Sequence, residues 1–138
     1  MNLDPIFEQI ATLRHPQTGC PWDLSQTLEA YLDPIAGEAG ELVEALQSGN
    51  RAHIREEAGD LLWNLCFVIA LAEEEGAFTR EDVLHDVVAK MRHRHPHVYG
   101  EEIARTPDDA LAAFRRAKAR EKDAPNKDAP PPKPAPSA

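Results

Sequence analysis

Residues 35–71 read IAGEAGELVEALQSGNRAHIREEAGDLLWNLCFVIAL, and this stretch decides the fold. Its apolar residues recur with the period of an α-helix, and Gly49 with Asn50 divides it into two helices. We expect the first helix to end at Gly49 and the second to cover residues 53–75. Consecutive helices joined by so short a turn pack antiparallel, so the stretch predicts a helical hairpin.

Each helix of the hairpin carries two acidic residues with i, i+3 spacing, so both carboxylates project from one side of the helix. The two pairs are Glu38 with Glu41 and Glu57 with Asp60. A lone acidic pair is most often a solvated face, but both pairs here adjoin apolar residues, and the hairpin can bring them together. Carboxylates gathered without a cation raise one another's pKa values. The pattern therefore predicts a site for Mg²⁺, which prefers oxygen ligands and is often shared with substrate phosphates, with Mn²⁺ as the alternative ion.

Two other interpretations concern residues near these acids. A di-iron carboxylate bundle needs two Glu-x-x-His elements. The chain offers only Asp82-x-x-His85, so that class of site is a weak rival. Asn64 follows Asp60 by one helical turn and is either an amide that supports the metal ligands or a satisfied residue at the core edge.

Before the hairpin we expect a helix over residues 3–13 and then a loop. The loop contains three breakers, which are Pro16, Gly19 and Pro21. Ser25 is a candidate N-cap for the next helical segment, which Pro34 is expected to kink or interrupt.

After the hairpin, Thr79 opens a capping box and a helix over residues 79–94. Pro96 is expected to end that helix. Thr106, followed by proline, opens a last helix that reaches residue 122. No stretch alternates like a β-strand, so the predicted fold is all-α with a four-helix-bundle-like core.

The helix segment 62–71 is apolar almost all round, which predicts burial at the centre of the molecule or against a partner subunit. We expect a homodimer or homotetramer whose contacts complete the core. The predicted domain covers residues 1–122, and the Pro- and Ala-rich residues 123–138 form a tail that is expected to be disordered.

The net charge of −9 argues against binding to nucleic acid or to an anionic membrane. No apolar run is long enough for a membrane span, and the N-terminal residues have no secretory signal. Cys20 and Cys66 form no C-x-x-C motif, which favours a reducing, cytoplasmic setting.

Three more motifs accompany the acid pairs in a fixed order along the chain. They are Gly19-Cys20-Pro21-Trp22-Asp23 before the pairs, Ala72-Glu73-Glu74-Glu75-Gly76-Ala77-Phe78 after them, and Lys90-Met91 followed by Arg94-His95-Pro96-His97-Val98-Tyr99-Gly100. With these motifs the sequence resembles the MazG-type nucleoside triphosphate pyrophosphohydrolases of the all-α NTP pyrophosphatase superfamily. The signature of that family, E-E-x-x-E and then E-x-x-D, is matched except that Gly37 replaces the first glutamate.

The resemblance implies Mg²⁺-dependent hydrolysis of (d)NTPs to (d)NMP and pyrophosphate, in a house-cleaning role for nucleotide pools. It implies that the catalytic and metal-binding residues are Glu38, Glu41, Glu57 and Asp60. We expect the substrate to contact Trp22, Asp23, Lys90, Arg94 and His95.

The residues alone leave some of these roles open. The indole of Trp22 either stacks on a base or plugs the end of the bundle. Arg94 and His95 either contact phosphate or cap the helix that ends beside them. If relatives use the missing glutamate to activate water, this chain, with Gly37 at that position, must use either Glu38 or a metal-bound hydroxide alone.

Two rival functions follow from the same residues. One is a related superfamily enzyme, such as a dUTPase-like, dCTPase-like or phosphoribosyl-ATP pyrophosphohydrolase, against which the motifs at residues 19–23 and 94–98 argue. The other is a non-catalytic regulator that binds nucleotide or metal, for which Gly37 is the hint.

Overall fold

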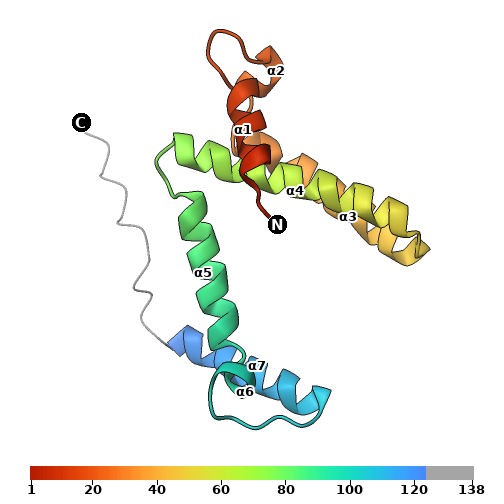
Figure 1. Cartoon of the computed structure of the whole chain (residues 1–138), viewed down its shortest axis with the longest axis vertical. Coiled ribbons are helices and arrows are strands. Elements are labelled where there is room, and N and C mark those ends of the chain that lie inside the picture. Colours follow the sequence, from red (N-terminus) through yellow and green to blue (C-terminus); the bar gives the residue numbers. More distant parts are fainter. Residues whose placement is uncertain (124–138) are drawn as a thin grey trace. The chain divides into compact units, whose positions relative to one another are not determined.

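The computed structural model describes residues 1–123, and within that range it contains helices and no strand. The elements in chain order are α1 (Asp4–Leu13), α2 (Pro21–Leu24), η1 (Glu29–Tyr31), α3 (Leu32–Ser48), α4 (Arg51–Glu74), α5 (Arg80–His93), α6 (Pro96–Tyr99) and α7 (Pro107–Asp123). The all-α prediction is confirmed. The chain divides into two compact units, one ending at Leu84 and the other beginning at His85 (Figure 1).

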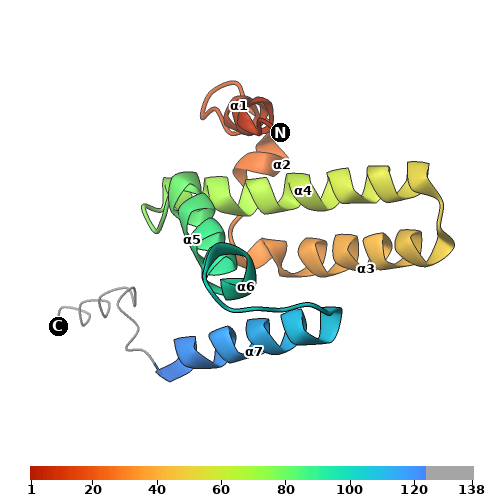
Figure 2. The ribbon, with the colours of Figure 1, turned by 60° about the horizontal axis from the view of Figure 1, so that its bottom comes forward.

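The predicted hairpin is present in the first unit. Figure 2 shows α3 and α4 side by side and antiparallel, joined by a tight turn. Gly49 ends α3 with φ of 70°, a left-handed conformation that glycine adopts without strain. Asn50 then caps α4, because its side-chain oxygen accepts hydrogen bonds from the N–H groups of Ala52 (3.0 Å) and His53 (3.2 Å).

The core of the first unit lies where α1 packs against α4. Phe7 and Ile10 of α1 are buried together with Phe67 and Leu71 of α4. Tyr31 stacks on Phe67 with ring centroids 4.9 Å apart, and its burial raises the pKa of the Tyr31 hydroxyl to about 12. This packing fixes α4, and therefore the hairpin, against the N-terminal helix.

Three predictions about the N-terminal region are wrong. Ser25 caps no following helix; it follows α2, and its hydroxyl donates a hydrogen bond to the carbonyl of Trp22 (2.6 Å). Pro34 neither kinks nor interrupts a helix, because it lies in the first turn of α3, where a backbone N–H has no partner within the helix. Pro21, expected in a loop, instead begins the short helix α2.

The predicted capping box at the start of α5 is confirmed. The N–H of Thr79 donates to the Asp82 carboxylate (2.8 Å), and the N–H of Asp82 donates to the Thr79 hydroxyl (3.1 Å). Thr106 caps α7 in the same way, accepting from the N–H of Asp109 (3.1 Å). Pro96 follows the end of α5, as expected, but it also begins the short helix α6, which the sequence did not indicate.

In the second unit, α6 packs against α7. None of the helices within residues 1–123 combines the length and the apolar character needed to cross a membrane. The predicted disordered tail, residues 123–138, lies outside the described residues apart from Asp123, which ends α7. The single domain expected over residues 1–122 stays a prediction.

Candidate metal centre

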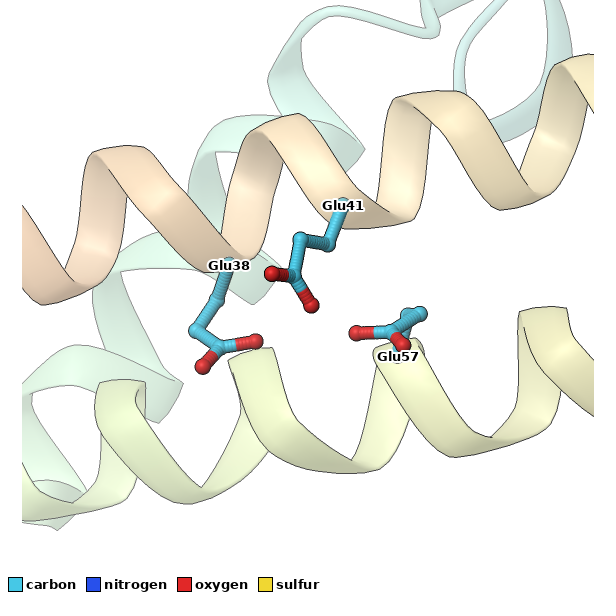
Figure 3. Close-up of side chains that lie close together, drawn as sticks. All are labelled: Glu38, Glu41 and Glu57. Atoms are coloured by element: carbon cyan, nitrogen blue, oxygen red, sulfur yellow. The ribbon is translucent and has the colours of Figure 1, made fainter.

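Three glutamates meet between the two helices of the hairpin. Glu38 and Glu41 project from α3 toward α4, and Glu57 projects back from α4, as Figure 3 shows. One carboxylate oxygen from each residue lies within 4.8 Å of the other two. The i, i+3 spacing on α3 places its two carboxylates on one side, and the antiparallel packing brings Glu57 opposite them.

Two of these carboxylates, those of Glu38 and Glu57, are partly removed from water and poorly compensated, whereas Glu41 is exposed. Glu57 is only 6% exposed. One oxygen of Glu38 and one of Glu57, Oε2 in both, are buried without a hydrogen-bond partner. Burial of this kind is unfavourable for a charged group unless another charge or donor compensates for it.

The electrostatics follow from this crowding. Burial, with added repulsion from Glu41 and Asp60, raises the pKa of Glu38. Burial and the nearby Glu41 raise the pKa of Glu57, while His53 acts in the opposite direction. Within residues 1–123, these three glutamates form one ion pair, which joins Glu57 to His53.

The residues present fit a hard divalent cation. Carboxylate oxygens from three residues converge, two buried oxygens lack a partner, and no arginine or lysine among residues 1–123 pairs with the cluster. Mg²⁺ and Mn²⁺ both accept carboxylate oxygens as ligands. A cation bound here would offset the effects of burial and of repulsion that raise the pKa values of Glu38 and Glu57.

The fourth predicted acid, Asp60, lies just outside the trio. It is exposed, yet it is close enough to raise the pKa of Glu38. It also lines a surface cavity of about 690 Å³ along the first turns of α4, together with His53 and Arg55. Asn64, one turn further, is half-buried, and both interpretations of it stay open.

His53 is a residue that the sequence analysis did not single out. Its Nε2 lies 3.1 Å from Oε1 of Glu57. The available signal was the i, i+4 spacing of histidine and glutamate, which places both side chains on one face of a helix. This spacing alone does not mark the pair as part of a site.

The Gly19–Asp23 motif presents Trp22 to solvent, since Trp22 is 61% exposed whereas Asp23 is buried. Arg14 holds the loop to α4 by donating to the carbonyl of Asp23 and by a two-pronged ion pair with Glu74 (2.7 and 2.8 Å). Gly19 is required because a Cβ there would lie 2.3 Å from the carbonyl oxygen of Leu13. The exposed indole argues against a plug at the end of the bundle.

The basic residues of the predicted substrate set belong to the second unit. Arg94 forms a two-pronged ion pair with Glu121 (2.8 and 3.1 Å). His95 hydrogen-bonds through Nδ1 to the carbonyl of Met91, so it takes the helix-capping alternative at the end of α5. Lys90 is exposed on α5. Contacts of these residues with phosphate stay a prediction.

Comparison with known proteins gives consistent results. A nucleoside triphosphate pyrophosphohydrolase of Escherichia coli K12 is 32% identical over 121 residues, which are 88% of this chain and 46% of that protein. The nucleoside triphosphate pyrophosphohydrolase/pyrophosphatase MazG of Thermotoga maritima is 37% identical over 121 residues, 85% of this chain and 46% of that protein. The chain thus spans about half the length of these curated relatives.

The fold has a solved counterpart in the crystal structure of a mazG-related protein from Thermotoga maritima. The two align with a TM-score of 0.68 and 29% sequence identity, covering 84% of this chain and 98% of the other. Residues 26–99 match the MazG nucleotide pyrophosphohydrolase domain, and this range includes all four predicted acids. The chain therefore belongs to the MazG nucleotide pyrophosphohydrolase domain family.

Proposed function

We propose that this protein is a Mg²⁺-dependent nucleoside triphosphate pyrophosphohydrolase that converts (d)NTPs to (d)NMPs and pyrophosphate. The observation that carries the proposal is the cluster of three glutamates, two of them with a buried oxygen that has no partner. Membership of the MazG domain family and the names of the relatives support the reaction class.

The four acids have the leading roles in this proposal. Glu38, Glu41 and Glu57 hold the cation between α3 and α4, and Asp60 joins them from the edge of the cluster. When bound, Mg²⁺ lowers the pKa of a coordinated water and neutralises charge that develops on the leaving pyrophosphate. Gly37 leaves Glu38 as the nearest acid on α3 to orient the attacking water.

The proposal also covers the residues that are expected to contact the substrate. Trp22 stacks on the base, since its indole is exposed and aromatic faces accept any base. Asp23 supports that loop from its buried position beside Trp22. Lys90 and Arg94 supply positive charge for the phosphates, which for Arg94 requires the ion pair with Glu121 to open. Contact of His95 with a phosphate likewise requires its ring to leave the carbonyl of Met91.

An oligomer completes the fold in this proposal. Large apolar side chains stay exposed on the hairpin, with Leu32 73%, Val43 52%, Leu46 56% and Leu65 46% exposed. A homodimer or homotetramer would bury them, because transfer of apolar side chains from water into an interface is favourable. Light scattering at micromolar concentration should find more than one chain per particle, and a monomer would contradict this part of the proposal.

The test of the reaction is an assay of purified protein with a panel of NTPs and dNTPs and Mg²⁺, with products separated by chromatography. Glu41→Gln and Asp60→Asn should abolish pyrophosphate release while circular dichroism shows unchanged helical content. Glu44→Gln is the matched control, since Glu44 is an exposed glutamate on the same helix. Full activity in either site variant would contradict the site assignment.

The same panel, with phosphoribosyl-ATP added and Mn²⁺ binding measured alongside, separates the rivals. Turnover of one pyrimidine dNTP alone, or of phosphoribosyl-ATP, would identify the related superfamily enzymes. Binding of Mn²⁺ without turnover of any nucleotide would identify a regulator. The house-cleaning role and the cytoplasmic location stay predictions.

A further inference from the structure

A histidine, His53, lies beside one of the three clustered glutamates, Glu57. The Nε2 atom of His53 is 3.1 Å from Oε1 of Glu57. The other oxygen of Glu57, Oε2, is buried without a hydrogen-bond partner. The two oxygens of Glu57 thus have different surroundings: Oε1 lies beside an imidazole, and Oε2 is buried without a partner.

His53 is itself held in place. Its backbone N–H donates to the side chain of Asn50 (3.2 Å), so it lies in the capped first turn of α4. Four residues separate it from Glu57, and this spacing puts both side chains on one face of the helix. The His53 side chain is 43% exposed, so the contact with Glu57 is not imposed by burial of the imidazole.

A free glutamate side chain has three rotatable bonds and samples many conformations, and several of them would turn its oxygens away from Glu38 and Glu41. A hydrogen bond to one oxygen removes much of that freedom. Groups that hydrogen-bond a metal-ligating side chain in this way orient it, and their loss typically weakens metal affinity by about 10–100-fold.

We propose that His53 is a positioning residue that holds Glu57 so that its second oxygen is presented to the divalent cation. The inference rests on the proposed function, because it concerns the same metal site. His53 touches neither the reacting atoms nor the cation in this role. Its effect is on how strongly the site binds metal.

The test is isothermal titration of the metal-free full chain with Mn²⁺ alone. His53→Leu, which keeps bulk but has no donor, should weaken Mn²⁺ binding by about 10–100-fold. His53→Gln, whose side-chain amide can still donate to Glu57, should restore most of the affinity. His85→Leu is the control, because His85 is 82% exposed and contacts only its neighbour Asp86 among the described residues.

A kinetic measurement separates positioning from a general structural role. In His53→Leu the Mg²⁺ concentration for half-maximal pyrophosphate release should rise, while the rate at saturating Mg²⁺ stays close to that of the unaltered protein. In His53→Asn the side chain is too short to reach Glu57, so this variant should behave like His53→Leu. It serves as the second variant if the leucine substitution lowers the helical content.

Unchanged Mn²⁺ affinity in folded His53→Leu and His53→Asn would overturn the inference while leaving the proposed function intact. Absence of Mn²⁺ binding in the unaltered protein would overturn the metal site itself, and the role of His53 with it. The two failures are therefore distinguishable in one set of titrations.

Discussion

Helix α4 carries acidic residues near both of its ends, in opposite electrostatic surroundings. Toward its C-terminus, Glu73 pairs with Arg80 (2.5 Å) and Glu74 pairs with Arg14 (2.7 Å). Toward its N-terminus, Glu57 faces other carboxylates and has a histidine as its partner. Arg80 lowers the pKa of Glu73, whereas burial and Glu41 raise the pKa of Glu57.

This difference shows that glutamates on one helix have two roles. The C-terminal acids connect α4 to other segments, since Glu74 reaches back to the residue after α1 and Glu73 reaches forward to the start of α5. Their charges are balanced within the protein. The N-terminal acids are balanced by nothing in the described residues except an imidazole, which is the arrangement expected when the compensating charge comes from a ligand.

Among variants that test this comparison of the two ends of α4, Glu57→Gln is expected to change activity and stability most. Loss of a metal ligand should reduce pyrophosphate release by at least about 100-fold. Without divalent metal, the same variant should melt at a higher temperature than the unaltered protein, because it removes a buried, uncompensated charge. Activity assays with Mg²⁺ and thermal melts in a chelator measure the two effects.

Glu73→Gln is the matched variant at the other end of the helix. It should keep its activity and melt at a lower temperature, because it breaks the contacts with Arg80. If both glutamine variants changed the melting temperature in the same direction, the distinction between the two ends would be wrong.

Arg14→Met should give the next largest effect, on stability. The Arg14 side chain is 12% exposed, and it contacts Glu74, the carbonyl of Asp23 and the ring of Phe67. Loss of charge-assisted hydrogen bonds at such a site typically reduces the free energy of unfolding by about 2 kcal/mol. Urea denaturation measures it. Arg115→Met, an exposed arginine on α7, is the control and should change little.

Gly37→Glu adds an acid next to Glu38 on α3 and should raise both stability and rate. A Cβ at Gly37 meets nothing within 4 Å, and glutamate in place of glycine within an exposed helix contributes roughly 0.5–1 kcal/mol. The variant also restores the acid of the family signature, so pyrophosphate release should increase. Gly37→Gln gives the helix stabilisation without the charge. Equal rates in the two variants would show that the acid adds nothing.

The smallest effect is the pH dependence of the Glu73–Arg80 pair. Because Arg80 lowers the pKa of Glu73 in the folded protein, its contribution is present above the ordinary glutamate pKa of about 4.3 and is lost as the pH falls through the lowered value. The difference in melting temperature between the unaltered protein and Glu73→Gln should shrink between pH 7 and pH 3. Exposed Glu75→Gln should show no such trend.

The sequence predicted the hairpin because its evidence is local. Helical periodicity, the glycine at position 49 and the i, i+3 spacing of the acids are all readable within a few residues. The convergence of Glu38, Glu41 and Glu57 then followed from antiparallel packing. Ser25 and Pro34 were misjudged because the same residue types suit either side of a helix boundary.

The ion pairs that join distant segments were not predictable in the same way. Arg14 and Glu74 are 60 residues apart, and Arg94 and Glu121 are 27 residues apart. The chain has 15 basic and 24 acidic residues, so charge alone does not select these partners. Only the packing of the helices brings each pair together.

Asn50 determines where α4 begins, and therefore the direction in which each acid of α4 projects from the helix. Successive residues of an α-helix are rotated by about 100°, and Glu57 lies about two turns after Asn50. One residue inserted between them would rotate the carboxylate away from α3, whereas one inserted before Asn50 would leave the phase of both helices unchanged. Length variation between the two acid pairs is therefore compatible with metal binding only in the turn, and not in the first two turns of α4.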